Sequence, residues 1–173
     1  FNGGNNDDSL RLSNGDLGLI TGTITFSGGS GTDAATMDDG TYNSPSTCTI
    51  GGNAFSRGAV GQLLWDAGVE SLTLNSGFNN DSINVNSITT GTPSIVINAS
   101  TGDDSCNVLL GGSGGNVTFN GGGGGGAAAL VVADLARSVA STYTVSGTTI
   151  TRGRSVNWSN TASVQLLGSG TAG

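Results

Sequence analysis

The sequence predicts an all-β fold, and three observations lead to this prediction. Short segments in which apolar and polar residues alternate recur along the chain, many of them about 10 to 13 residues apart. Turn-forming residues separate these segments, and glycine alone provides 32 of the 173 residues. Only two prolines, which cannot donate to a strand ladder, are present. A period of two places one face of each segment in a core, as in a β-strand.

The expected strands follow one another through most of the chain. They are centred near Leu10, Ile24, Leu72, Ile83, Val96, Cys106, Val117, Leu130, Val145 and Ile150. The stretch from Gly40 to Gly61 is less regular and contains Pro45, so we expect it to leave the sheets as a loop. Residues Ala127–Ser141 could form a helix, or a strand (ALVVAD) followed by a loop. We favour the strand, because the aligned segment Asp33–Asp39 is too short for a helix.

A diverged internal repeat divides the chain into two copies, residues 1–96 and 97–173. "FNGGNNDDSL" at the start aligns with "INASTGDDSC" from Ile97, and "TITFSGG" aligns with "NVTFNGG". Trp65 then falls on Trp158, so one unit of about 95 residues occurs nearly twice. Both ends of the chain lie inside the unit. We therefore expect one segment of a longer array, or a subunit that continues into an identical neighbour.

Two architectures accommodate many short strands at this spacing. One is a set of antiparallel β-sandwich repeats, and the other is a parallel β-helix (β-solenoid). The internal repeat favours the β-helix, with coils of about 20–25 residues and about four coils in each unit. Gly and Asn at the corners tolerate the left-handed backbone that sharp bends need. We predict the parallel β-helix and keep the β-sandwich as the alternative.

The composition argues against several classes of function. The net charge is −7 and there is no lysine, whereas nucleic-acid binding needs clustered Lys and Arg, so we expect no nucleic-acid partner. The chain has no histidine and one glutamate, Glu70, which we interpret as an exposed strand residue. Since common general acids and bases are missing, we predict no enzyme activity, no catalytic residues and no cofactor other than calcium. No run of about 18 apolar residues exists, so we expect no membrane span.

Cys48 and Cys106 are the two cysteines of the chain. A disulfide between them is compatible with an exported protein. Two small residues buried in a core is the simpler interpretation, and we favour it.

Four aspartates, Asp8, Asp33, Asp81 and Asp104, occupy turns of similar sequence. These turns are GGNNDDSLR, GGSGTDAAT, SGFNNDSIN and ASTGDDSCN. They resemble the nonapeptide G-G-x-G-x-D-x-U-x of haemolysin-type (RTX-like) calcium-binding repeats. The resemblance implies a calcium site at the four aspartates, provided that they stack on neighbouring coils. No two of the turns are adjacent in the sequence, however, and Asp also closes turns by bonding its own backbone.

The longer phrase GVESLTLNSGFNNDSINVNSITTGTP resembles the repeats of very large Gly/Thr/Asn-rich bacterial surface proteins, as does TYTVSGTTITRG. This resemblance implies an extracellular location at the cell surface and a structural or adhesive role. We therefore expect a scaffold or filament subunit that assembles end to end with itself. The alternative is a calcium-stabilised adhesin or glycan-binding segment, whose partner would be a surface glycan.

Overall fold

The computed structural model confirms the all-β prediction. It describes residues 1–58, 60–86, 93–111, 114–135 and 141–168. These residues form 17 strands and a single short 3-10 helix, η1 (Leu17–Leu19). No helix in this part of the chain is long and apolar enough to cross a membrane.

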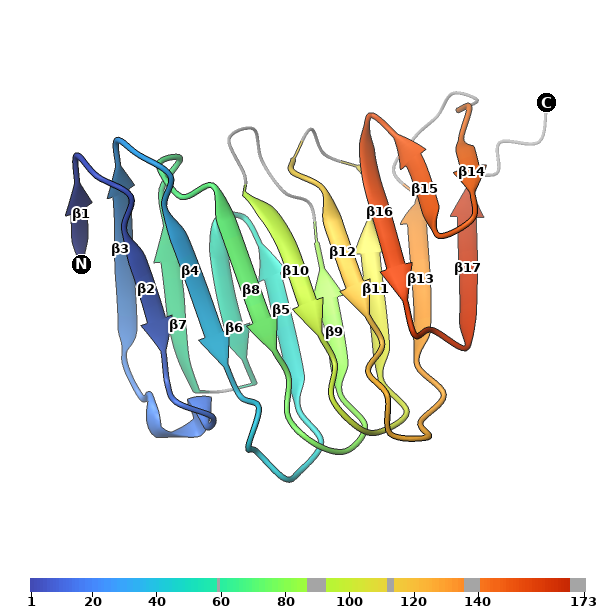
Figure 1. The fold of residues 1–173 in the computed structure, drawn as a ribbon, viewed down its shortest axis with the longest axis horizontal. Helices are drawn as coiled ribbons and strands as arrows, with labels where there is room; N and C mark the ends of the chain where they lie inside the picture. Colours follow the sequence, from blue (N-terminus) through green and yellow to red (C-terminus); the bar gives the residue numbers. More distant parts are fainter. Residues whose placement is uncertain (59, 87–92, 112–113, 136–140, 169–173) are drawn as a thin grey trace.

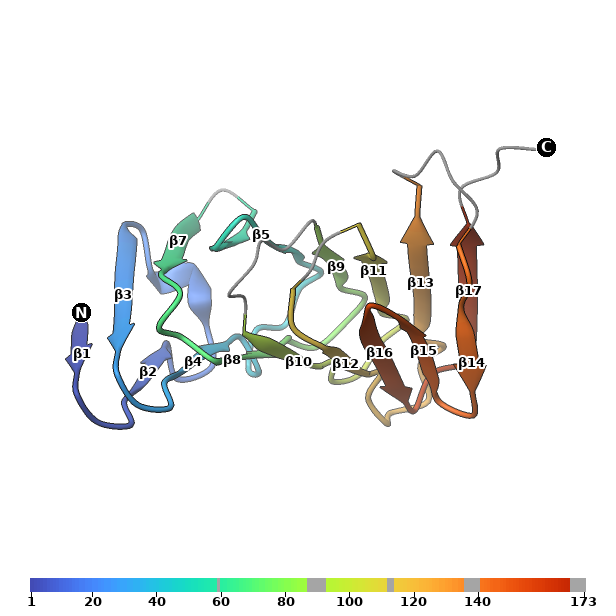
Figure 2. The same ribbon diagram turned by 90° about the horizontal axis from the view of Figure 1, so that it is seen from above.

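The strands form two sheets that lie on opposite sides of one core (Figures 1 and 2). The nine-stranded sheet has the order β1 (Asn2–Gly4), β3 (Thr23–Gly29), β7 (Val60–Trp65), β6 (Ala54–Arg57), β5 (Thr47–Gly51), β9 (Ser82–Val85), β11 (Ser105–Leu109), β13 (Ala129–Asp134) and β17 (Ser163–Gly168). The eight-stranded sheet has the order β14 (Thr144–Ser146), β15 (Thr149–Arg152), β16 (Arg154–Ser159), β12 (Val117–Asn120), β10 (Ser94–Asn98), β8 (Ser71–Asn75), β4 (Ala34–Asp38) and β2 (Ser9–Leu12).

Outside two hairpins, successive strands alternate between the two sheets, and neighbouring strands within each sheet are parallel. Among the central strands, Asn75 lies beside Asn98, 23 residues later, and Asp81 precedes Asp104 by the same interval. Apart from β6 and β15, strands of the nine-stranded sheet point one way and those of the eight-stranded sheet the other (Figure 1).

The antiparallel pairs belong to two inserted hairpins. The hairpin β5–β6 adds two strands to the nine-stranded sheet between β7 and β9. The hairpin β14–β15 extends the eight-stranded sheet beyond β16. The expectation of a loop from Gly40 to Gly61 was wrong for the parts that form β5 (Thr47–Gly51), β6 (Ala54–Arg57) and the start of β7. Cys48 and Ile50 alternate with polar residues and are both fully buried, so β5 is an ordinary strand of the sheet.

The apolar side chains that alternate along each strand meet between the sheets. Leu72, Ile95 and Val117 stand in register on β8, β10 and β12, and each is at most 1% exposed. In this row each strand covers the apolar side chain of the strand before it. Loss of such side chains would cost several kcal/mol each, on the order of 2–5.

Trp65 and Trp158 occupy corresponding places on different sheets. In the nine-stranded sheet, Trp65 of β7 pairs in register with Phe26 of β3. In the eight-stranded sheet, Trp158 of β16 pairs with Phe119 of β12. Each tryptophan thus lies at or next to the end of a strand that follows an inserted hairpin, beside a phenylalanine.

Two smaller expectations can also be compared with the structure. The segment ALVVAD forms strand β13, as predicted, while residues 136–140 of the following loop lie outside the described residues. Cys48 and Cys106 are free thiols, each buried in the core. Both lie in register with Ile83, which stands between them, so they are not neighbours in the sheet.

Candidate functional site

The structure separates the four predicted aspartates into two pairs. Asp8 and Asp33 lie at corners that lead into β2 and β4 of the eight-stranded sheet. Asp81 and Asp104 lie at corners that lead into β9 and β11 of the nine-stranded sheet. Because strands of the two sheets run in opposite directions, these corners are at opposite ends of the strands (Figure 1). One shared calcium site made of all four residues is therefore not formed.

In the first pair, the carboxylate of Asp33 caps the corner that holds Asp8, and Glu70 in turn caps the corner that holds Asp33. The backbone N–H of Asp8 donates to Asp33 Oδ1 at 2.8 Å, and the N–H of Asp33 donates to Glu70 Oε2 at 2.7 Å. Glu70 thus belongs to the same series of acidic corners. It is exposed, as expected, but it lies in the corner before β8 and not in a strand. Neighbouring Asp7 makes the opposite contact at the surface, where it accepts the N–H of Thr32 from the corner that follows.

The second pair repeats this arrangement at the other end of the strands. The N–H of Asp81 donates to Asp104 Oδ1 at 2.8 Å, and Asp81 Oδ1 accepts the N–H and the hydroxyl of Ser46 at 2.8 and 2.9 Å. Asp81 and Asp104 are 2% and 1% exposed, and the second oxygen of each carboxylate is buried without a hydrogen-bonding partner. Burial raises the pKa of Asp104, and the hydrogen bond from the N–H of Asp81 opposes this rise.

These pairs have the chemistry of caps on the backbone. Calcium takes six to eight oxygen ligands, whereas Asp33, Asp81 and Asp104 each already use one carboxylate oxygen on a backbone N–H group. Among the described residues, no group of three or more His, Cys, Asp or Glu side chains is placed to hold a metal ion. Calcium binding at Asp8, Asp33, Asp81 and Asp104 thus stays a prediction from the resemblance.

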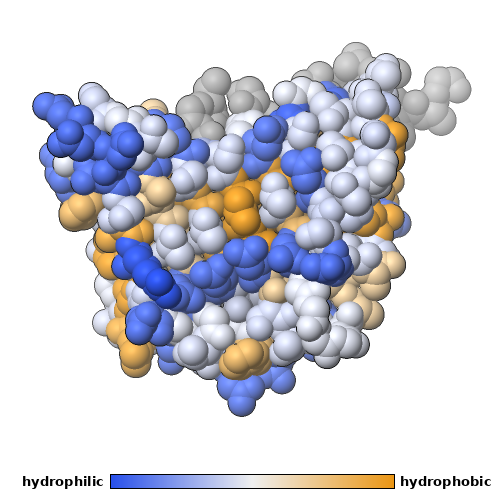
Figure 3. Space-filling view, viewed as in Figure 1, coloured by the Kyte–Doolittle hydropathy of each residue, from blue (hydrophilic) through white to orange (hydrophobic). Residues whose placement is uncertain are grey.

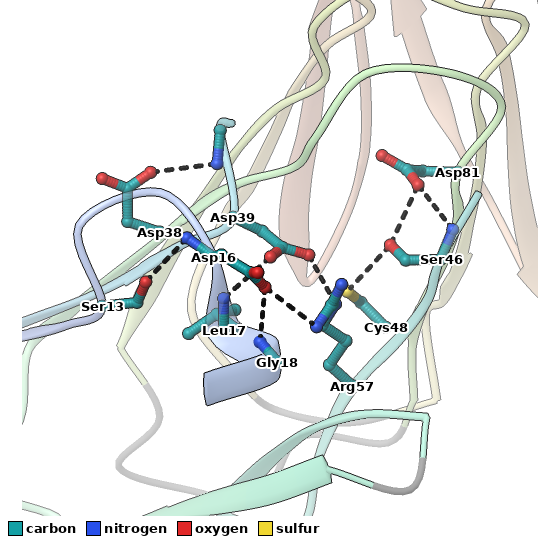
Figure 4. A network of polar contacts seen from close by, with 11 residues as sticks. Ser13, Asp16, Leu17, Gly18, Asp38, Asp39, Ser46, Cys48, Arg57 and Asp81 are labelled. Carbon is teal, nitrogen blue, oxygen red and sulfur yellow. Dashed lines mark hydrogen bonds and ion pairs between the residues drawn. The ribbon is translucent and has the colours of Figure 1, made fainter. Parts of the chain in front are cut away.

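A charged cluster that the sequence did not suggest lies at the base of the first hairpin (Figure 4). Arg57, at the end of β6, places Nε 2.5 Å from Asp39 Oδ2, and its guanidinium carbon lies 3.8 Å from the centre of the Tyr42 ring. Asp39 Oδ1 accepts the N–H of Leu17, and Asp16 Oδ1 lies 3.7 Å from Arg57. Burial raises the pKa of Asp39, while the Leu17 N–H and Arg57 act in the opposite direction.

The second hairpin has a cluster of the same composition. Arg152 Nη1, at the end of β15, lies 2.8 Å from Asp134 Oδ2, and the Tyr143 hydroxyl donates to the same oxygen at 2.7 Å. Asp134 is 1% exposed, and its hydrogen bond with Tyr143 is the main cause of a raised pKa of that phenol. The spacing between aspartate and arginine is identical in the two copies. That spacing was the signal in the sequence that could have identified these clusters.

Arg154 is a second buried arginine, besides Arg57. It is 3% exposed, and its Nη2 donates to the carbonyl of Leu109, the last residue of β11. Burial lowers the pKa of this guanidinium. Its Nε and Nη1 are buried without a hydrogen-bonding partner. The side chain therefore joins the two sheets from within.

The acidic corners and the hairpin clusters are therefore internal supports of the sheets, with no arrangement of nucleophile, base and oxyanion donors among them. Comparison of the chain with protein-family models, with curated proteins and with solved structures gives no match.

Proposed function

We propose that this chain is an extracellular structural segment, a β-solenoid of the parallel β-helix type that assembles end to end on the bacterial cell surface. The alternation of strands between two sheets and the parallel pairing at intervals of about one coil support the solenoid. The Gly/Thr/Asn-rich surface-protein resemblance supports the location. A mechanical role needs no reactive group, and it depends on ladders of backbone hydrogen bonds along one axis.

The observation that carries this proposal is that, among the described residues, the outermost strands of both sheets have a paired neighbour on one side only. The nine-stranded sheet ends in β1 and β17, and the eight-stranded sheet ends in β2 and β14. Figure 1 shows β1 and β17 pointing in one direction and β2 and β14 in the other. A neighbour displaced along the axis would therefore continue both sheets with parallel strands. Unpaired strand edges of this kind are templates for pairing with another chain.

Light scattering over a series of protein concentrations, combined with negative-stain electron microscopy, tests this proposal. We expect elongated particles whose length grows with concentration. The variant Phe1→Glu places a charge at the N-terminal edge, where Phe1 is 61% exposed and packs on Phe26, and should shorten the particles. Leu19→Glu is the matched control, because Leu19 is 81% exposed but lies on η1 outside the edge strands. Monodisperse monomers at every concentration would rule out end-to-end assembly.

Glycan binding is the second candidate function, and the outer face of the eight-stranded sheet favours it. Thr36, Thr73, Val96 and Thr118 stand in one row on β4, β8, β10 and β12. Figure 3 shows this face as mostly neutral, with a hydrophilic band across it and an apolar patch at the centre. Hydroxyl groups beside an apolar patch suit a sugar surface. A glycan array with the wild-type chain and a Thr73→Lys variant would test this role, and equal signals from both would exclude this face.

A further inference from the structure

The outer face of the eight-stranded sheet carries two parallel rows of side chains. The strands β8, β10 and β12 each contribute one residue to the first row and, two positions later, one residue to the second. The first row, called here the Thr row, consists of Thr36, Thr73, Val96 and Thr118. The second, called here the Asn row, consists of Asn75, Asn98 and Asn120.

Both rows are held in fixed positions. In the Asn row, Asn98 Nδ2 donates to Asn75 Oδ1 at 2.9 Å, and Asn120 Oδ1 accepts Asn160 Nδ2 at 2.9 Å. The Thr row contains only β-branched side chains, whose first torsion angle is restricted. Side-chain ladders of this kind stabilise flat sheets. Figure 2 shows β8, β10 and β12 nearly level with one another, so the two rows lie on a flat surface.

The two rows form a regular grid. Neighbouring residues within a row lie on paired strands, which are about 4.8 Å apart. Thr73 and Asn75 are two residues apart on one strand, which places the rows about 6.7 Å from each other. On the prism face of ordinary hexagonal ice, oxygen atoms repeat at similar distances along two perpendicular directions. Water molecules held by this grid therefore fit the pattern of an ice surface.

This face is also free of charge over four strands. Among the described residues, the outward side chains of β8, β10, β12 and β16 are all uncharged and none is aromatic. A charge would orient the nearby water around itself and disturb a lattice. Protein interfaces favour aromatic side chains, Met and Arg, so this composition does not suit a protein partner. Arg11 and Asp38, on β2 and β4, are bound to each other at one side of the face.

We propose that the Thr row and the Asn row form an ice-binding surface, whose ligand is the flat face of an ice crystal. The hydroxyl and amide groups bind water molecules of the lattice, and the methyl groups of threonine and Val96 lie between them. Fixing a bridging water molecule costs entropy, but water in ice is already fixed. The side chains are also fixed before binding, which removes a second cost. This inference goes beyond the proposed structural function and does not depend on end-to-end assembly.

Nanolitre osmometry with a single seeded ice crystal tests this inference. It measures thermal hysteresis, the gap between the melting and the freezing temperature of the crystal. The wild type should show a gap that grows with protein concentration. Thr73→Tyr should lose this gap, because the ring stands above the grid and keeps the ice away. Thr49→Tyr is the matched control and should keep the gap, since Thr49 is a half-buried strand threonine on the outer face of the other sheet.

A second pair of variants makes the test independent of the tyrosine substitution. Val96 is 36% exposed, so Val96→Lys is expected to fold, and its charge should also abolish the gap. Val131→Lys, on the outer face of β13, is its control and should keep the gap. Circular dichroism shows that each variant is folded before it is compared.

The outcomes decide the inference in either direction. Loss of the gap in Thr73→Tyr and Val96→Lys alone supports it. A wild type without thermal hysteresis would overturn it, and a glycan signal from the same protein would then leave only the sugar-binding role for this face. A gap that is equal in the wild type and in Thr73→Tyr and Val96→Lys would place ice on another surface and overturn it. Loss of the gap in all four folded variants would overturn it too, because the effect would not depend on this face.

Discussion

Arg57 Nε lies 2.5 Å from Asp39 Oδ2, and this contact fastens the end of the β5–β6 hairpin to the corner that follows β4. Asp39 is fully buried and Arg57 is 6% exposed. A charge in such a place is tolerated because its partner is adjacent. The contact therefore ties the hairpin to the corner beside the eight-stranded sheet, in addition to the backbone pairing of β5 with β9 and of β6 with β7.

We expect Asp39→Asn to lower the free energy of unfolding by about 3 kcal/mol, because it leaves Arg57 buried beside a neutral group. The double variant Asp39→Asn with Arg57→Met should recover part of this loss, since it removes the unpaired charge. Urea unfolding followed by circular dichroism measures both values. Asp134→Asn is a useful comparison and should cost less, because the Arg152 side chain is 13% exposed and retains access to water. Equal losses at the two sites would contradict this account.

The pH dependence of stability should differ between the wild type and Asp104→Asn. Burial raises the folded-state pKa of Asp104 above its ordinary value of 3.8, so the folded state holds this proton more tightly than the unfolded state. Its contribution is fully present below pH 3.8 and is lost as the pH rises through the folded pKa. Relative to Asp104→Asn, the wild type should therefore gain stability as the pH falls from neutrality towards 3.8. Urea unfolding of both proteins at several pH values measures this gain, and parallel pH profiles would refute it.

Removal of calcium should leave the melting temperature of the chain unchanged. The acidic corners bind backbone N–H groups of neighbouring coils, and this contact needs no metal. Thermal unfolding with excess chelator and with added calcium, at equal ionic strength, makes the comparison. A large drop in the melting temperature with chelator would instead favour the calcium-stabilised adhesin.

Gly28 should not tolerate a side chain. A Cβ atom at this position would lie 1.8 Å from the carbonyl oxygen of Gly68 on the next coil. We expect Gly28→Ala to cost about 1–3 kcal/mol, because backbone on both sides must move. Gly22→Ala is the control, since a Cβ atom there would have no heavy atom within 4 Å. The two variants are compared by urea unfolding, and similar stabilities would show that the coils can separate at Gly28 without cost.

The sequence was informative wherever the structure is governed by local alternation. The strands around Leu72, Ile83 and Val117 could be predicted from period-two patterns. Alternate residues of a strand point to the same face, so the apolar positions of each short segment show which face is buried. The β5–β6 hairpin was missed because Pro45 and several glycines surround it, and these residues signal a loop equally well. The Asp39–Arg57 contact leaves no pattern within either segment, and only the equal spacing of Asp134 and Arg152 in the second copy could have revealed it.

The four aspartates show a different limit of sequence reasoning. Their turns were identified correctly as corners of similar sequence. Whether a corner lies at one end of the strands or at the other depends on how many times the chain crosses between the sheets. Asp33 and Asp81 are separated by an inserted hairpin and by strands of both sheets, and the spacing in the sequence does not reveal an odd number of crossings.

The odd number of crossings between the sheets affects how successive copies would be oriented in any longer array built from this unit. Phe26 and Trp65 lie in one sheet, and their counterparts Phe119 and Trp158 lie in the other. Each copy is thus turned by half a revolution relative to the copy before it. The first hairpin adds its strands to the nine-stranded sheet, and the second adds its strands to the eight-stranded sheet. In an array of this kind, a surface loop encoded once per unit would face opposite sides in successive copies.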